Sequence, residues 1–562
     1  MKKNKIFSIL SAAFLFSAAT SCIEVIDPMN TPISSDQLNQ SADAYKTAVL
    51  AVTSTLFGNF TYGNDNSNAR DFGYPAFYLV RDMTGQDIAQ PNDNWFGPWY
   101  EASGIGQSTG AAQFYWTCYY KWINNCNKVI GLSGENPVEA DAIHKHGAGT
   151  ALAIRAMLYL DMARMFAPEN YAMNKSALTV PIVTESTTIE QASKNPRATN
   201  ETMYEFIISD LNKAEECLAD YNCAGDKKVP DLSVVYGLKA RTYLEMEDWA
   251  NARKYAKLAQ ENYATETEEE YTSRETGFNT PISSWMLCLT QKSDDPCILE
   301  NDADTSWGSN MCLEINPYTV GCGYAANYGY ASYIDRHLYE TIPTTDFRKK
   351  CFVDFTIDDI EDEDAQLEAL SAYSDHPDWL LNTGNAVSGW GKVGGLPLKF
   401  RTAGGETGRN NQYVGFLVSV PMMRVEEMYL IEAEAAGMMN ESEGVALLTA
   451  FAQQRDPNYV YGTHQDAYGN AGTSVFQNEI WWQRRVEFWG EGLSMFDIKR
   501  LNKGIIRSYA NSNHLETVQW NTTSAPSWMN FVIVQTESNY NSAIVNNPEP
   551  IAPSSKSPEF IW

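Results

Sequence analysis

The sequence predicts a mainly α-helical protein, a tetratricopeptide-like scaffold of helical hairpins with a large irregular lobe inserted into it. Two observations carry this prediction. Apolar residues recur at i, i+3, i+4 and i+7 in segments before residue 262 and after residue 420. Between these limits the periodicity weakens and Gly, Asn, Asp, Tyr and Trp accumulate, which indicates long loops with short strands.

The predicted helices are expected to pack in pairs. The clearest pair spans 232–245 and 249–261, joined by the short turn 246–248. Alanines at 240, 250, 252 and 256 allow these two helices to approach closely, which is typical of a tetratricopeptide-type hairpin. The other predicted helices span 44–57, 114–130, 151–166 and 202–218, and a further pair at 422–436 and 443–454 follows the lobe.

The N-terminus has the order of an export signal. Lys2, Lys3 and Lys5 precede a short apolar run at 6–19, and small residues then lead to Cys22. The run is too short to span a bilayer as a helix, so we expect residues 1–21 to be removed. The small residues before Cys22 resemble the lipobox of bacterial lipoproteins, which implies lipidation of Cys22 and attachment to a membrane. The alternative is an ordinary cleaved signal with a chance cysteine.

Composition excludes several classes of partner. The formal net charge is −29, and removing residues 1–21 takes away three lysines and no acids, which changes it to −32. Nucleic acids and anionic lipid surfaces are bound through Lys and Arg, so neither is expected as a partner. Nine cysteines remain besides Cys22, an odd number without zinc-ligand spacing. Disulfides between residues 217 and 223, or 312 and 322, are left open.

Four motifs occur along the chain. The helix at 151–166 contains Arg155-Ala156, and the hairpin pattern covers 231–258. Residues 424–434 read Arg-x-x-Glu-x-x-Leu-x-x-Ala-Glu. Residues 482–492 read Trp-Gln-Arg-Arg-Val-Glu-Phe-Trp-Gly-Glu-Gly, and Phe-Asp-Ile-Lys-Arg follows at 496–500.

In this order, and together with the lipobox, these motifs resemble the SusD/RagB family of surface glycan-binding lipoproteins of Bacteroidota. The chain departs from the family pattern at Gln483 and Leu493, where Glu and Arg are usual, and at its Pro-Ile-Ala-Pro close (550–553). The resemblance implies five regions: a signal peptide (1–21), a lipidated tether (22–35), an N-terminal helical-repeat region (36–261), an inserted ligand-binding lobe (262–420) and a C-terminal region (421–562).

Charged residues of the late motifs are expected to be structural. Charges on amphipathic helices usually form solvated or interhelix pairs. We therefore predict ion pairs, and no ligand contacts, for Arg424, Glu427, Arg484, Arg485 and Glu487.

A sugar ring packs its C–H face on aromatic planes, while its hydroxyls need amide, carboxylate or guanidinium partners. The segment 71–100 supplies this mixture, and the resemblance implies that such a region contributes to a binding patch. The candidate residues are Asp71, Arg81, Asn94, Trp95 and Trp99. For Arg81 an ion pair with Asp71 is the alternative, and for the two tryptophans a place in the core.

The resemblance implies a second contribution from the inserted lobe. Trp307, followed by Gly308, is the first candidate for a stacking platform. Tyr318 and Tyr328 lie in a glycine-rich stretch that suits an aromatic loop, although such loops also occur as packed corners.

The resemblance implies a non-catalytic, surface-exposed protein that is anchored by lipid to the outer membrane. It would capture oligosaccharides and deliver them to a TonB-dependent, SusC-like transporter. No cofactor or metal is expected, because no motif for either is present. The segment 106–110 matches Gly-x-Ser-x-Gly but lacks the preceding strand of a nucleophile elbow. Two alternatives stay open: a peptide-binding member of the same family, and a lipid-anchored glycoside hydrolase using paired carboxylates.

Overall fold

A computed structural model describes residues 42–57, 62, 69–92, 94–221, 223, 225–387, 389–464 and 472–562. Cys22, the signal segment and the tether lie outside these residues. The described part is dominated by helices, with two small two-stranded sheets. This is the mainly α architecture that the periodicity predicts.

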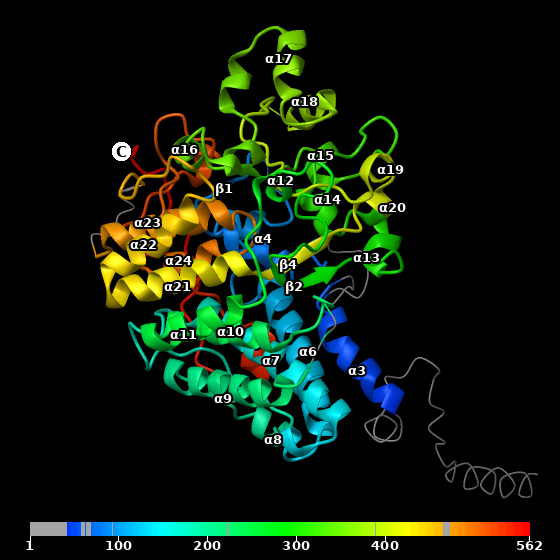
Figure 1. The fold of residues 1–562 in the computed structure, drawn as a ribbon, viewed down its shortest axis with the longest axis vertical. Coiled ribbons are helices and arrows are strands. Elements are labelled where there is room, and N and C mark those ends of the chain that lie inside the picture. Colours follow the sequence, from blue (N-terminus) through cyan, green and yellow to red (C-terminus); the bar gives the residue numbers. More distant parts are fainter. Residues whose placement is uncertain are drawn as a thin grey trace, which may run out of the picture.

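The helices form a layered array. Helix α7 packs on α6 and α9, α10 packs on α9, and α11 packs on α10. The array then continues from α11 directly to α21, and α22 covers α21 (Figure 1). The helices of the array are α6 (Gly110–Leu132), α7 (Ala142–Phe166), α9 (Asn200–Leu218), α10 (Leu232–Glu245), α11 (Trp249–Gln260), α21 (Val425–Met439) and α22 (Glu441–Ala452).

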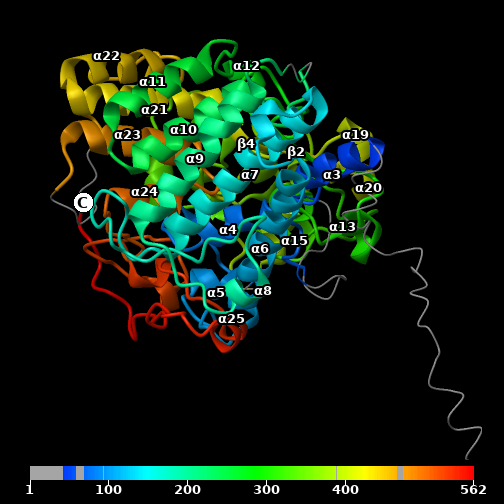
Figure 2. The ribbon, with the colours of Figure 1, turned by 90° about the horizontal axis from the view of Figure 1, so that it is seen from below.

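Local sequence explains where these helices begin. Asp231 and Asp248 accept hydrogen bonds from the backbone N–H groups of Val234 and Asn251, so they cap α10 and α11. Alanines 252, 256 and 259 of α11 are fully buried at the helix contact. The close helix pairing expected from the alanine spacing is therefore present, and Figure 2 shows α10, α11, α21 and α22 grouped at one side of the body.

The inserted lobe leaves and rejoins the array at one place. Strand β2 (Trp285–Thr290) pairs antiparallel with β4 (Ser419–Arg424), which leads straight into α21. A second antiparallel pair, β1 (Ile88–Ala89) with β3 (Tyr333–Ile334), ties the lobe to the N-terminal region. The lobe also contains short helices: α12 (Glu268–Tyr271), α13 (Pro296–Leu299), α14 (Trp307–Met311), α15 (Tyr324–Asn327), α16 (Arg336–Thr341), α19 (Gly405–Arg409) and α20 (Gln412–Gly415).

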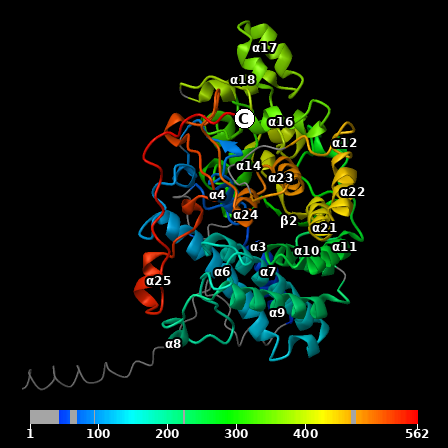
Figure 3. The same ribbon diagram turned by 90° about the vertical axis from the view of Figure 1, so that its left-hand side faces the viewer.

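Two helices of the lobe project from the body. Helices α17 (Glu363–Leu370) and α18 (Pro377–Ala386) stand at the top of Figure 1, and Figure 3 shows the same projection from the side. A separate small core holds this region together and includes Tyr333, Val353, Leu370, Leu380 and Leu396. Helix α18 also contacts α15, so the projection is joined to the loops below it.

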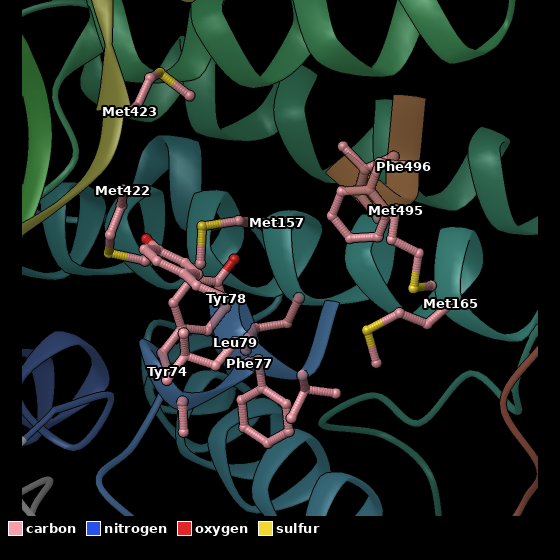
Figure 4. Close-up of a cluster of buried hydrophobic side chains, with 14 of the residues drawn as sticks. Tyr74, Phe77, Tyr78, Leu79, Met157, Met165, Met422, Met423, Met495 and Phe496 are labelled. Atoms are coloured by element: carbon pink, nitrogen blue, oxygen red, sulfur yellow. The ribbon is translucent and has the colours of Figure 1, made fainter. Parts of the chain in front are cut away.

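A short helix, α4 (Ala76–Asp82), lies at the centre of the main core. All seven of its residues are buried. Figure 4 shows Phe77, Tyr78 and Leu79 among methionines of the surrounding elements. Flexible Met side chains fill irregular gaps, which suits a place where a helix array, a strand and a late helix meet. These methionines are Met157 and Met165 of α7, Met422 and Met423 of β4, and Met495 of α24 (Ser494–Arg500).

A buried network of charges joins the lobe to the C-terminal region. Arg424 contacts Glu426 (3.1 Å), Glu487 (3.0 Å) and Glu491 (2.8 Å), and it lies 3.9 Å from Glu266. Glu487 ends α23 (Val475–Glu487). Three further cations complete the network: Arg348 and Arg455 contact Glu487, and Lys399 contacts Glu491.

The motif residues predicted to be structural are all in buried ion pairs. Besides Arg424 and Glu487, Glu427 pairs with Arg241, Arg484 with Asp497, and Arg485 with Asp87. Gln483, one departure from the family pattern, accepts a hydrogen bond from Arg348 at 2.9 Å. A neutral amide oxygen thus serves as the acceptor at this position.

Two further expectations concern the membrane and the cysteines. In the described part of the chain, no helix combines the length and hydrophobicity needed to cross a bilayer. The nine described cysteines are free thiols, so neither Cys217 and Cys223 nor Cys312 and Cys322 are bridged.

Candidate functional site

The β1–β3 pair brings the N-terminal segment after residue 89 against the loop before residue 333. Ile88 is opposite Ile334, and Ala89 is opposite Tyr333. Side chains extend the pairing beyond the strands: the Gln90 amide donates to the carbonyls of Tyr330 (3.2 Å) and Ala331 (3.3 Å). Asn92 donates to the carbonyl of Gly329 at 3.2 Å. The two loops that follow and precede these strands are therefore held together.

Aromatic side chains of both loops meet beyond this connection. Trp95 is 40% exposed, and its ring lies edge-on to that of Tyr324, with centroids 6.5 Å apart. Tyr324 in turn contacts Tyr328 (5.7 Å) and Tyr330 (5.8 Å). Tyr328 is 41% exposed, and its hydroxyl donates to the carbonyl of Gly321 at 3.0 Å, which fixes the ring.

A third segment continues this face. Tyr413 of α20 is 40% exposed, and its hydroxyl donates to the carboxylate of Asp302 at 3.1 Å. Tyr318 is 69% exposed and lies in the turn after Asn316, whose side chain bonds to Asn410 just before α20. We call Trp95, Tyr324, Tyr328, Tyr413 and Tyr318 the aromatic surface. Tyr324 belongs to α15 and Tyr413 to α20, and these two helices lie on the same side of the body (Figure 1).

The backbone beside the aromatic surface is strained at one turn. Asn301, Asp302 and Ala303 are consecutive and have φ of 50°, 53° and 62°. The left-handed conformation costs L-residues about 1–2 kcal/mol each, although Asn and Asp tolerate it best. Such strain persists only where the surroundings impose it, and it concentrates at functional sites.

The surroundings of this turn do impose it. Ala303 is completely buried in a small core with Ile298, Ile315 and Phe416. Its carbonyl accepts a hydrogen bond from Ser306 at 2.7 Å. Asn301 and Asp302 remain exposed, so the turn presents two polar side chains toward solvent.

Acidic groups dominate the electrostatics of this face. Burial raises the pKa of Asp304, although its carboxylate accepts hydrogen bonds from Ser309 (3.0 Å) and Gly323 (2.7 Å). Burial, followed by the negative charge of Asp304, raises the pKa of Tyr328 to about 12. The Tyr328 hydroxyl is thus a protonated donor throughout the neutral pH range.

Four residues predicted from the sequence lie at this face. Trp95, Tyr318 and Tyr328 expose large parts of their rings. Asn94 is half-buried, and its side-chain oxygen accepts a hydrogen bond from the N–H of Phe96 at 2.8 Å. Its amide nitrogen is the group left to meet a hydroxyl.

Four other predicted residues are buried and are removed from the candidate site. Trp307 is 1% exposed, and its ring packs edge-on against Tyr78 and Phe400, so it presents no face to a ligand. Trp99 is buried in the core. Asp71 is also buried and accepts a hydrogen bond from the N–H of Tyr62.

Arg81 is buried because α4 lies at the centre of the core. It pairs with Asp161 of α7 at 3.0 Å and has 1% of its surface exposed. The expectation of a structural ion pair is correct, but the partner is Asp161 and not Asp71. Neither Arg81 nor Asp71 is available to bind sugar hydroxyls.

Three residues of this face were not predicted from the sequence: Asn301, Asp302 and Tyr413. Tyr413 reaches Asp302 only because α20 packs on the turn at 301–303. The pair is separated by 111 positions, and no local pattern signals it. The segment at 106–110 gives no catalytic site, since a turn precedes α6 there and Thr109 caps this helix.

Comparisons with known proteins agree with this architecture. A family model described as "Starch-binding associating with outer membrane" matches residues 58–244, and a model of the SusD family matches residues 376–552. No curated protein matches the sequence. The two models together match well over half of the chain.

Solved structures share the fold. A SusD-like carbohydrate binding protein from Bacteroides vulgatus has a TM-score of 0.67 at 22% identity, covering 90% of this chain and 97% of that protein. A SusD superfamily protein from Bacteroides thetaiotaomicron has a TM-score of 0.64 at 20% identity, covering 90% and 100%. Surface glycan-binding protein A from Bacteroides thetaiotaomicron, solved with laminarihexaose, has a TM-score of 0.63 at 16% identity, covering 90% and 99%. On the family models and the shared fold, the chain belongs to the SusD/RagB family.

Proposed function

We propose that this protein binds oligosaccharides on its aromatic surface. The observation that carries the proposal is that half-exposed Trp95 and Tyr328 both pack against Tyr324. Half-exposed Tyr413 bonds to Asp302, whose charge also acts on Tyr328. Partly exposed rings that are fixed by edge contacts offer preformed faces for sugar C–H groups. The similarity in fold to a protein solved with laminarihexaose supports the same ligand class.

Glycan-array binding followed by titration calorimetry tests this proposal. We expect Trp95→Ala and Tyr328→Ala each to weaken binding of the best glycan about 3- to 10-fold, since an aromatic contact contributes about 0.5–1.5 kcal/mol. Tyr540→Ala is a matched control: this residue is 51% exposed but lies beside α8 (Ile189–Ala192), away from the aromatic surface. Unchanged affinity in both site variants would contradict the assignment.

The same experiment separates the two alternatives. A peptide-binding protein would bind extended peptides and leave the glycan array empty. A glycoside hydrolase would release new reducing ends from polysaccharides, and one carboxylate substitution would abolish the release. Binding without release is the result that the proposed function requires.

We further propose that Cys22 carries lipid and that the protein passes its ligand to a TonB-dependent, SusC-like transporter. The lipobox-like sequence and the outer-membrane association in the family description support this placement. Cys22→Ala is expected to abolish fatty-acid labelling and release the protein from the membrane fraction. Affinity purification from native membranes is expected to recover the transporter, and its consistent absence would count against the partnership.

A further inference from the structure

We propose that the carboxylate of Asp302 makes the aromatic surface selective for uncharged sugars over sugars that carry carboxylate or sulfate groups. This inference rests on the proposed function, and it adds the class of glycan. Three observations support it: the strained turn positions Asp302, tyrosine rings lie beside this carboxylate, and no Lys or Arg among the described residues forms an ion pair with it.

Asp302 lies beside two residues of the aromatic surface, Tyr413 and Tyr328. Its carboxylate accepts a hydrogen bond from the Tyr413 hydroxyl at 3.1 Å. Its negative charge contributes to the raised pKa of both Tyr328 and Tyr413. A ligand that stacks on either ring therefore passes close to this carboxylate. With one oxygen bonded to a tyrosine, the carboxylate keeps lone pairs for sugar hydroxyls.

The acids of the turn are not neutralised by neighbours. Among the described residues, no ion pair joins a Lys or Arg to Glu300, Asp302 or Asp304. Glu300 and Asp302 are exposed, whereas Asp304 is buried and accepts a hydrogen bond from the Gly323 N–H. The local field is therefore negative, in a chain whose net charge is also strongly negative.

The strained backbone keeps this charge in place. Ala303 is anchored in the small core and Ser306 holds its carbonyl, so the turn cannot rotate Asp302 away without exposing buried apolar surface. A fixed carboxylate accepts hydrogen bonds from the hydroxyl groups of a neutral sugar. It repels a uronate or sulfate that would occupy the same position, because like charges at close range repel each other, and at this exposed position salt weakens the repulsion.

A matched pair of ligands tests the inference. The first probe is whichever of maltohexaose, laminarihexaose and mannohexaose binds most tightly. The second probe is the same oligosaccharide after oxidation of its primary hydroxyls to carboxylates. Wild-type protein is expected to bind the neutral probe at least about tenfold more tightly at low salt. The gap is expected to shrink in 1 M NaCl, where the screening length falls to about 3 Å.

Asp302→Asn is the decisive variant, because Asn also tolerates the left-handed conformation and keeps the side-chain shape. It is expected to narrow the gap between the two probes severalfold, mainly by improving binding of the oxidised probe. Asp364→Asn on the projecting helix α17 removes the same charge from an exposed position and is expected to leave the gap unchanged.

The outcomes distinguish the two proposals. Equal or tighter binding of the oxidised probe by wild-type protein would overturn the charge selection and leave glycan binding intact. An unchanged gap in Asp302→Asn would also overturn it, since the selection would then come from elsewhere. Failure of every neutral probe and of the glycan array would overturn the proposed function, and this inference with it.

Discussion

The substitution Glu266→Gln tests whether the buried charge network holds a proton at neutral pH. The network contains five acids (Glu266, Asp346, Glu426, Glu487 and Glu491) and four bases (Arg348, Lys399, Arg424 and Arg455). One proton would balance these charges. Burial raises the pKa of Glu266 from 4.5 to about 8, and its carboxyl lies 3.9 Å from Arg424, which is already paired with other acids.

The sign of the pH dependence follows from the raised pKa. Below pH 4.5 Glu266 is protonated in both the folded and the unfolded chain. Between pH 4.5 and 8 only the folded chain keeps this proton, so the free energy of unfolding falls as pH rises, by up to about 1.4 kcal/mol per pH unit. From pH 5 to 7.5 this group contributes a loss of about 3 kcal/mol, and Gln at this position contributes none.

Calorimetry at a fixed scan rate measures the difference. An unfolding entropy of about 2.1 cal/mol/K per residue gives roughly 1.1 kcal/mol/K for this chain, so 3 kcal/mol corresponds to about 3 °C in Tm. We expect the Tm of Glu266→Gln, relative to wild type, to increase by about 3 °C between pH 5 and 7.5. Glu361→Gln at an exposed position is the control. A difference that stays constant across this range would refute the reasoning.

Three other substitutions probe the scaffold and the aromatic surface. Asp210→Ala is expected to lower the free energy of unfolding by about 3–5 kcal/mol, because Arg155 stays buried without the carboxylate that it binds through two hydrogen bonds of 2.8 and 2.9 Å. The loss is measured as a lower Tm, and an unchanged Tm would contradict this expectation. Gly329→Ala is expected to weaken glycan binding, measured by calorimetry, because it would displace the loop that carries Tyr328. The backbone φ at Gly329 is +78°, and the new Cβ would lie 2.3 Å from the carbonyl oxygen of Ala386. Wild-type affinity in this variant would show that the loop is not part of the site. Tyr328→Phe is expected to bind within about threefold of wild type, because the ring face contributes more than the hydroxyl; a loss equal to that of Tyr328→Ala would assign the contribution to the hydroxyl.

The repeat helices could be predicted closely because their signals are local. The predicted helices 232–245 and 249–261 agree with α10 and α11 to within one residue, since Asp caps and buried alanines are readable in the sequence. The pairing of β2 with β4 was not predicted. Its partners Trp285 and Arg424 are separated by more than a hundred residues, and their contact depends on the path of the whole lobe.

The candidate site was predicted only in part, and Trp307 shows why. With its glycine neighbour, it was the first candidate for a stacking platform. In the structure a Cβ at Gly308 would lie 2.8 Å from Phe416, so this glycine marks close packing. Trp95 and Trp99 show the same ambiguity: they are four positions apart, yet Trp95 precedes α5 (Gly97–Tyr100) and is exposed, whereas Trp99 lies in α5 and faces the core.

The residues of the family motifs are not the residues proposed to bind the ligand. Arg424, Glu487 and Arg485 belong to buried ion pairs that hold the lobe, the array and the N-terminal region together. Removing one partner of such a pair leaves an uncompensated buried charge, which constrains these positions strongly. The aromatic surface instead combines loop residues such as Trp95 with Tyr413 of the short helix α20, and these side chains are partly exposed and uncharged, so that replacing one leaves no buried charge. Under the proposed function, substitutions in the aromatic surface are therefore expected to change ligand binding without disturbing the ion pairs of the motifs.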